Sequence, residues 1–150
     1  MYYKGIEPKI FYEYFIEAPE KAGLIDYRFM CFNGKVKFLL VDINTMDVEG
    51  GHSTNAKRNV YDREFNLLPI KVTRPTFDPC LLQKPINWDR MLEIAEKLSK
   101  PFIHCRIDLY NVGGKIYFGE ITFHHAGGCN KIEPEEMQLE WGSYIQLPNE

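Results

Sequence analysis

Residues 26–43 read DYRFMCFNGKVKFLLVDI, and this stretch decides the fold. Two runs rich in aromatic and β-branched residues, Asp26–Phe32 and Lys35–Ile43, flank the dipeptide Asn33-Gly34. Runs of this composition favour β-strands. Asn-Gly supplies the positive φ angles that a two-residue turn between antiparallel strands requires. The stretch therefore predicts a β-hairpin.

Further strands are predicted on both sides of this hairpin. Residues 9–17 (KIFYEYFIE) are aromatic and β-branched, as are residues 102–110 and 116–123, which are joined by an Asn- and Gly-rich connection. Residues 44–59 are polar and predict a mobile loop, whereas residues 60–72 have room for one more, irregular strand. These segments predict a sheet that is largely antiparallel.

Two helices complete the prediction. Residues 87–99 carry an apolar stripe at helical spacing, with Asn87 as the N-cap and Pro101 just after the end. A shorter helix is expected from Pro134 to about Trp141, with Gly142 as its C-terminal cap. Strands with interspersed helices indicate an α+β fold with one long and one short helix in a single domain.

Composition narrows the function. The chain has 150 residues, 45% of them hydrophobic, and a net charge of −3, so we expect a globular protein that does not bind nucleic acid. No stretch approaches the roughly 18 apolar residues of a membrane-spanning helix, and the N-terminal residues do not resemble a signal peptide. None of the four cysteines is in a C-x-x-C pair. We therefore expect a cytoplasmic protein with reduced cysteines and no membrane insertion.

The segment that carries the most chemistry is residues 105–128, CRIDLYNVGGKIYFGEITFHHAGG. Because side chains alternate along a strand, Arg106 and Asp108 share one face, and Glu120 and Thr122 share one face of the next strand. A turn with an odd number of residues would put Asp108 opposite Glu120 and Arg106 opposite Thr122. A turn with an even number would put the two acids on opposite faces of the sheet.

Two carboxylates that face each other across a hairpin repel, which destabilises the sheet. A cation between Asp108 and Glu120 would remove this cost, and Mg2+ prefers such oxygen ligands together with substrate phosphates. Arg106 beside them could then bind a phosphate oxygen. Alternatively, the two acids are ordinary polar residues on the solvated face of the hairpin. Spacing alone leaves both interpretations open.

The segments RIDLY (106–110) and GKIYFGEITF (114–123) resemble the metal-binding hairpin of ATP-grasp enzymes. The similarity is closest to the TupA-like branch, whose members are associated with the biosynthesis of teichuronopeptide and capsular polysaccharide. It extends over residues 8–148 and includes the segments DYRFMCFNGKVKFLLVD, NVYDREFNLLP, MLEIAEKLSKPF and LEWGSYIQLP.

This resemblance implies a metal site in the hairpin. Asp108 and Glu120 would be the ligands of Mg2+, and Thr122 stands where the family usually has a third ligand, asparagine. A threonine hydroxyl is a weaker ligand, so a second Mg2+ would be held loosely or with more water. Arg106 would stabilise the phosphoryl group during transfer and the acyl-phosphate that forms.

The resemblance also implies an ATP site. Residues 11–16 (FYEYFI) resemble the hinge beside the adenine, where Glu13 would contact the amino group and Ile16 would offer its backbone to the ring. Asp26 is the candidate for the ribose hydroxyls, with Glu20 second. The implied activity is ATP-dependent joining of a carboxylate to an amine, with ATP and Mg2+ as cofactors.

A complete ATP-grasp enzyme has a further subdomain before the hinge, with lysines that hold the α- and β-phosphates. Eight residues precede the hinge strand here, and Lys4 and Lys9 lie too close to it to replace those lysines. We therefore expect residues 1–150 to be the C-terminal portion of the fold. A partner chain or the missing subdomain would complete it, or the chain is a non-catalytic remnant or partner-binding module. A homodimer that forms through the exposed face of the sheet is a separate alternative.

Two other chemistries remain as alternatives. His124, His125 and Cys129 lie close together in the sequence, with His104 and Cys105 on a neighbouring strand. These side chains could bind a zinc ion. Adjacent histidines on a strand point to opposite faces, however, and the spacing matches no established zinc motif. A cysteine nucleophile, Cys105 or Cys129 with His124, is the second alternative.

Overall fold

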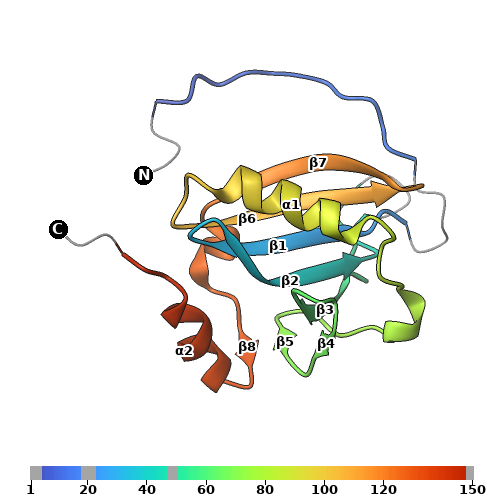
Figure 1. Ribbon diagram of the computed structural model, residues 1–150. Helices are drawn as coiled ribbons and strands as arrows, with labels where there is room; N and C mark the ends of the chain where they lie inside the picture. Colours follow the sequence, from blue (N-terminus) through green and yellow to red (C-terminus); the bar gives the residue numbers. More distant parts are fainter. Residues whose placement is uncertain (1–4, 18–22, 47–50, 148–150) are drawn as a thin grey trace.

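The computed structural model describes residues 5–17, 23–46 and 51–147. Figure 1 shows a curved sheet with α1 across one face and α2 beside its lower end. The strands are β1 (Asp26–Phe32), β2 (Lys35–Ile43), β3 (Lys57–Asp62), β4 (Leu67–Leu68), β5 (Lys71–Val72), β6 (His104–Val112), β7 (Lys115–Thr122) and β8 (Ile132–Glu133). The helices are α1 (Trp88–Ser99) and α2 (Glu136–Ser143), with short 3-10 helices η1 (Pro79–Leu81) and η2 (His125–Gly128).

Within the described residues, six strands form one sheet in the order β4-β3-β2-β1-β6-β7, and β5 pairs with β8 in a second. Every pairing is antiparallel, which confirms the α+β class and the largely antiparallel sheet. The predicted β1–β2 hairpin is also confirmed. Phe32 pairs with Lys35, and Asn33 and Gly34 between them have φ angles of 49° and 73°. Positive φ at both central residues is the turn that Asn-Gly favours.

The face of the sheet under α1 is the larger hydrophobic core. Alternate residues of β1 point to it, namely Tyr27, Phe29 and Cys31, and they pack against the apolar stripe of α1. Its fully buried members include Phe29, Leu39, Met91 and Ile107. Burial of each such side chain contributes roughly 1.5–3 kcal/mol, so this core holds α1 on the sheet.

The opposite face has two halves of different character. In one half Phe38 of β2 stacks on Trp141 of α2, with ring centroids 3.8 Å apart, and these rings belong to a second apolar cluster with Met30 and Leu40. In the other half the inward side chains are charged. Those that are buried are Asp26, Asp42, Arg58, Arg106 and Asp108. Burial of an unpaired charged side chain costs free energy, so a cluster of buried charges marks this half of the sheet as the candidate functional site.

The predicted strand over residues 9–17 is wrong. Residues 5–17 have no regular secondary structure and pass above β7 in Figure 1 without pairing with it. A strand is stable only when another backbone satisfies its hydrogen bonds, and the sequence pattern of residues 9–17 cannot provide that partner.

Three smaller predictions also need correction. Strand β3 begins at Lys57, inside the predicted loop 44–59. Asn87 stands at the N-cap position of α1, but its side chain does not cap the helix, because its Oδ1 accepts a hydrogen bond from the side-chain amide of Asn111. Helix α2 runs from Glu136 to Ser143 with Gly142 inside it, and the next residue keeps right-handed helical angles. In the described part of the chain, no helix has both the length and the apolar character needed to span a membrane.

Candidate functional site

An open groove of about 560 Å³ lies against the charged half of the sheet. Five residues that the sequence singled out line it, namely Glu13, Ile16, Asp26, Asp108 and Glu120. The groove is further lined by Arg28, Thr45, His52, Arg74, Tyr110 and Phe118. Residues from both ends of the predicted site thus share one cavity, although residues 13–16 and 108–120 are far apart in the sequence.

The β6–β7 hairpin brings the two acids together in a way that turn length alone does not predict. Its turn has two residues, Gly113 and Gly114, because Val112 pairs with Lys115. An even turn was expected to separate the acids. However, the register shifts between Ile107 and Leu109, and Arg106 pairs with Thr122. One extra residue in β7 forms a β-bulge opposite Asp108, which returns Glu120 to the face of Asp108.

Gly119 makes this bulge possible. A Cβ atom at this position would lie 3.1 Å from the carbonyl oxygen of Asp108 and 3.2 Å from the ring of Tyr110. Both distances are shorter than ordinary van der Waals contacts, so a side chain here would force the two strands apart by a few tenths of an ångström.

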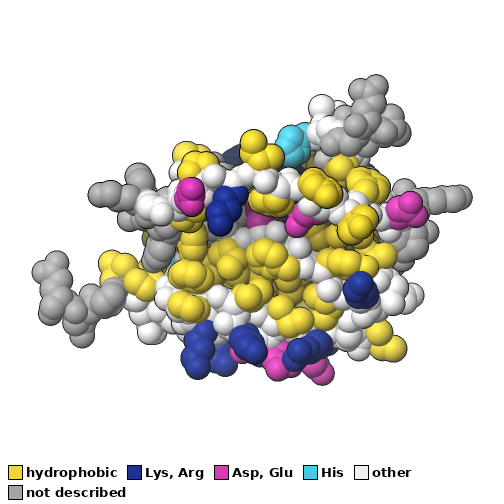
Figure 2. Space-filling model, turned by 90° about the horizontal axis from the view of Figure 1, so that it is seen from above, with side chains coloured by type: hydrophobic (Ala, Val, Ile, Leu, Met, Phe, Trp, Pro, Cys, Tyr) yellow, Lys and Arg dark blue, Asp and Glu magenta, His cyan; other side chains and the backbone are white. Residues whose placement is uncertain are grey.

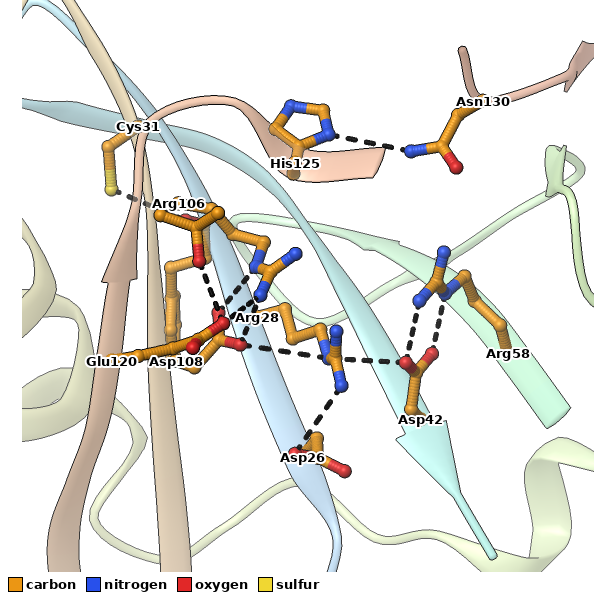
Figure 3. Close-up of polar contacts among 12 residues, drawn as sticks. Asp26, Arg28, Cys31, Asp42, Arg58, Arg106, Asp108, Glu120, His125 and Asn130 are labelled. Carbon is orange, nitrogen blue, oxygen red and sulfur yellow. Dashed lines mark hydrogen bonds and ion pairs between the residues drawn. The ribbon is translucent and has the colours of Figure 1, made fainter. Parts of the chain in front are cut away.

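Arg106 lies between the two acids (Figure 3). Its Nε donates to Oδ1 of Asp108 and its Nη2 donates to Oδ2, both at 2.7 Å. The same Nη2 donates to Oε1 of Glu120 at 2.5 Å, and the Thr122 hydroxyl donates to that oxygen at 2.7 Å. The two predicted carboxylate ligands therefore share one guanidinium nitrogen, and the hydroxyl of Thr122, the third predicted ligand, is bonded to Glu120.

Asp42 of β2 forms a second charged centre (Figure 3). It is completely buried and accepts two hydrogen bonds from Arg58, at 2.5 and 2.6 Å, and one from Arg74 at 2.7 Å. Charge-assisted and bidentate bonds of this kind are the strongest that side chains make. Asp42 therefore fixes the arginines at this end of the groove.

Arg28 lies between the two centres. Its Nε is 3.1 Å from Asp42 and 3.8 Å from Asp108, and its Nη2 is 3.6 Å from Asp26. Among the described residues, this buried Nε has no hydrogen-bond partner. The four acids of the cluster, Asp26, Asp42, Asp108 and Glu120, are matched by four arginines, Arg28, Arg58, Arg74 and Arg106. The formal charges of these eight side chains therefore sum to zero, and their ion pairs connect them across the floor of the groove.

Burial and charge shift the pKa values of several of these groups. Burial raises the pKa of Asp108 above its ordinary value, although the hydrogen bonds from Arg106 oppose this effect. Burial lowers the pKa of Arg28, but Asp42, Asp26 and Asp108 more than compensate, and the net shift is upward. Burial, followed by the charge of Asp26, raises the pKa of Tyr110 to about 12. Arg28 therefore stays charged and Tyr110 stays neutral across the physiological range.

Three of the residues predicted to bind the nucleotide, Glu13, Ile16 and Asp26, line the groove. Asp26 is buried and accepts a hydrogen bond from the hydroxyl of Thr45 at 2.8 Å. Glu13 is exposed and Ile16 half-buried, both in the segment without regular structure. Glu20, the second ribose candidate, lies outside the described residues.

Two histidines meet beside the cluster. Nε2 of His104 lies 3.3 Å from Nε2 of His125, and Nδ1 of His104 lies 2.9 Å from the carbonyl oxygen of Cys31. A carbonyl only accepts, so His104 carries its proton on Nδ1 and accepts through Nε2 from protonated Nε2 of His125. Nδ1 of His125 then accepts from the amide of Asn130 at 3.4 Å. Burial and the charges of His104 and Arg106 lower the pKa of His125 to about 4.

The zinc and cysteine alternatives can be compared with this geometry. Across residues 5–17, 23–46 and 51–147, no three His, Cys, Asp or Glu side chains gather in a group that could hold a metal ion. Cys105 is buried in the core under α1, on the face of the sheet away from the groove, whereas Cys129 is exposed.

A magnesium ion fits the residues of the hairpin. Asp108, Glu120 and Thr122 offer oxygen atoms only, and the carboxylates of Asp108 and Glu120 converge on one cationic nitrogen, Nη2 of Arg106. The hydroxyl of Thr122 is bonded to the same oxygen of Glu120. Mg2+ is typically held by one or two carboxylates, with phosphate oxygens and water completing its octahedron. Two carboxylates and a hydroxyl match this pattern.

Sequence reasoning missed Arg28, Asp42 and Arg74 as part of the site. The signal for the first two was present, since Arg28 lies between Tyr27 and Phe29, and Asp42 lies between Val41 and Ile43. Arg74 follows β5 in an irregular segment, and only the folded chain brings it to Asp42.

Comparison with known proteins identifies the class. A family model covers residues 1–146, which makes the chain an ATP-grasp protein. The family is the one described as TupA-like ATPgrasp, and the chain belongs to it. No curated protein and no solved structure matches the chain significantly.

Proposed function

We propose that the groove binds ATP with Mg2+, and that Asp108 and Glu120, assisted by Thr122, are the metal ligands. Membership of the family supports an ATP-related function. The observation that carries the proposal is that Glu13, Ile16, Asp26, Asp108 and Glu120 line one cavity. The adenine would lie by Glu13 and Ile16, the ribose by Asp26, and the phosphates by the two acids of the hairpin.

The reaction we propose is the ATP-dependent joining of a carboxylate to an amine, in the biosynthesis of teichuronopeptide or of a cell-surface polysaccharide. The carboxylate attacks the γ-phosphorus, ADP leaves, and the amine then attacks the acyl-phosphate carbon and releases phosphate. Mg2+, when bound, would neutralise the phosphate charge and orient the transferred group. Arg106 would donate to the oxygens of the phosphoryl group, where phosphoryl transfer depends on positioning and charge stabilisation. Lysines for the α- and β-phosphates would come from a further subdomain or a partner chain.

The first experiment is calorimetric titration with ATP, with and without Mg2+, of the wild-type protein and of Glu120→Gln. We expect binding that requires Mg2+ and that weakens about tenfold or more in Glu120→Gln, because a carboxamide is a much weaker magnesium ligand. Glu93→Gln is the matched control, since Glu93 is an equally exposed glutamate on α1 that pairs with Arg90. Unchanged affinity in Glu120→Gln would exclude this metal site, and an equal loss in Glu93→Gln would show a nonspecific charge effect.

A further inference from the structure

We infer that Arg106 is a resident cation that occupies the metal site, so that metal ion and guanidinium compete for Asp108 and Glu120. This inference rests on the proposed function and adds the way in which the metal ion enters the site. The metal ion would enter when the guanidinium leaves, and the phosphates of ATP would hold the guanidinium once it has left. Metal and ATP would then bind cooperatively.

The contacts of Arg106 carry the first step. One nitrogen atom, Nη2, bonds both to Oδ2 of Asp108 at 2.7 Å and to Oε1 of Glu120 at 2.5 Å. A cation coordinated by these two oxygens must occupy the space that Nη2 now fills. Arg106 also donates to the second oxygen of Asp108 through Nε, so the same guanidinium engages both oxygens of this carboxylate. A metal ion that bridges Oδ2 of Asp108 and Oε1 of Glu120 therefore has to displace Nη2.

Burial explains why the site holds a cation at all times. The side chains of Arg106 and Asp108 are only 10% and 5% exposed. A carboxylate so deeply buried is costly unless a positive charge accompanies it. Arg28 does not fill this role alone, because it lies 3.8 Å from Asp108 and shares its charge with Asp42 and Asp26.

The exposure of the site gives the direction of exchange. Glu120 is 60% exposed, so an incoming cation reaches this carboxylate first, while Asp108 remains covered. The displaced guanidinium keeps its five donors, which match phosphate oxygens in bidentate geometry. Binding a phosphate there removes the competitor from the acids. By linkage, ATP then raises the metal affinity by the same factor as the metal raises the affinity for ATP.

The test measures binding of Mn2+ alone, without nucleotide, by electron paramagnetic resonance of free Mn2+. We expect Arg106→Gln to bind Mn2+ at least about tenfold more tightly than the wild type, because the competitor is absent. Arg28→Gln is the matched control. It removes one positive charge near the same carboxylate but does not open the space between Asp108 and Glu120. We expect its Mn2+ affinity to rise by less than about threefold, because Arg28 lies 3.8 Å from Asp108 and shares its charge with Asp42 and Asp26.

A second measurement observes the exchange itself. The side-chain Nε–H signal of Arg106 in a nitrogen-15 NMR spectrum, assigned with Arg106→Gln, should shift as Mg2+ saturates the wild-type protein. Circular dichroism confirms that each variant is folded. Equal or weaker Mn2+ binding in folded Arg106→Gln, an equal gain in Arg28→Gln, or an unmoved signal at saturating Mg2+ would overturn the exchange. Absence of Mn2+ binding from wild type and variants alike would instead remove the proposed metal site.

Discussion

Replacing Asp42 with asparagine tests whether the charged floor of the groove is held by one buried carboxylate. Asp42 is completely buried and accepts three hydrogen bonds, two from Arg58 and one from Arg74, while Arg28 lies 3.1 Å away. The neutral amide of Asp42→Asn would leave three guanidinium groups without their shared counter-charge. Removing one partner of a buried pair typically costs about 3–5 kcal/mol of the free energy of unfolding.

The arginines differ in how far they can relax. Arg74 is one-third exposed and can turn toward solvent, whereas Arg58 is almost fully buried and cannot. We therefore expect Asp42→Asn to lie near the lower end of that range, at roughly 3 kcal/mol. Urea unfolding followed by tryptophan fluorescence measures this loss.

Glu96→Gln is the matched control for Asp42→Asn. Glu96 also accepts from two cationic side chains, Lys35 at 3.0 Å and Arg63 at 3.1 Å, but both of these are well exposed. Water can replace the lost partner there, so we expect a loss of only about 1 kcal/mol or less. A cost for Asp42→Asn no larger than for Glu96→Gln would refute the view that burial makes this carboxylate indispensable.

Two further predictions concern the hairpin and the histidine pair. Gly119→Ala should weaken Mn2+ binding about tenfold while leaving the fold intact, because the new methyl group would push Glu120 away from Asp108; unchanged affinity in the titration would contradict this. His125 has a folded pKa of about 4, below its usual 6.5, so the unfolded chain takes up the proton first as the pH falls. The free energy of unfolding should therefore decrease as the pH falls from 6.5 to about 4. Because His125 is partly exposed, we expect this decrease to be only roughly 1 kcal/mol larger in the wild type than in His125→Gln, as measured by urea unfolding at the two pH values. Parallel curves for the two proteins would contradict the assignment.

The parts of the fold that could be predicted depend on signals within a few residues. Asn33-Gly34 specifies its own turn, and the apolar stripe of α1 repeats at helical spacing. The prediction of a strand over residues 9–17 was wrong because it depended on residues far away in the sequence. Its residues favour extended structure, but strand formation depends on a partner elsewhere in the chain.

The site was predictable in outline and not in register. The pattern of Arg106, Asp108, Glu120 and Thr122 pointed to one face of a hairpin, and the structure brings these side chains together. Counting turn residues could not settle the register, because a single bulge residue reverses the result. Gly119 is the visible trace of that bulge, since glycine inside a strand often marks one.

The segment that passes over the groove has a consequence for handling the protein. Residues 5–17 expose large hydrophobic side chains, among them Ile10, Phe11, Tyr12 and Phe15. Among the described residues, the neighbouring strand β7 pairs only with β6, and Phe118 on it is 55% exposed. Seen from above, hydrophobic side chains spread over this side of the molecule (Figure 2). An open strand edge beside exposed aromatic groups is a template for self-association, opposed by a net charge of only −3. The colloidal behaviour of the chain therefore depends on concentration, and titrations are best made in dilute solution with light scattering recorded alongside.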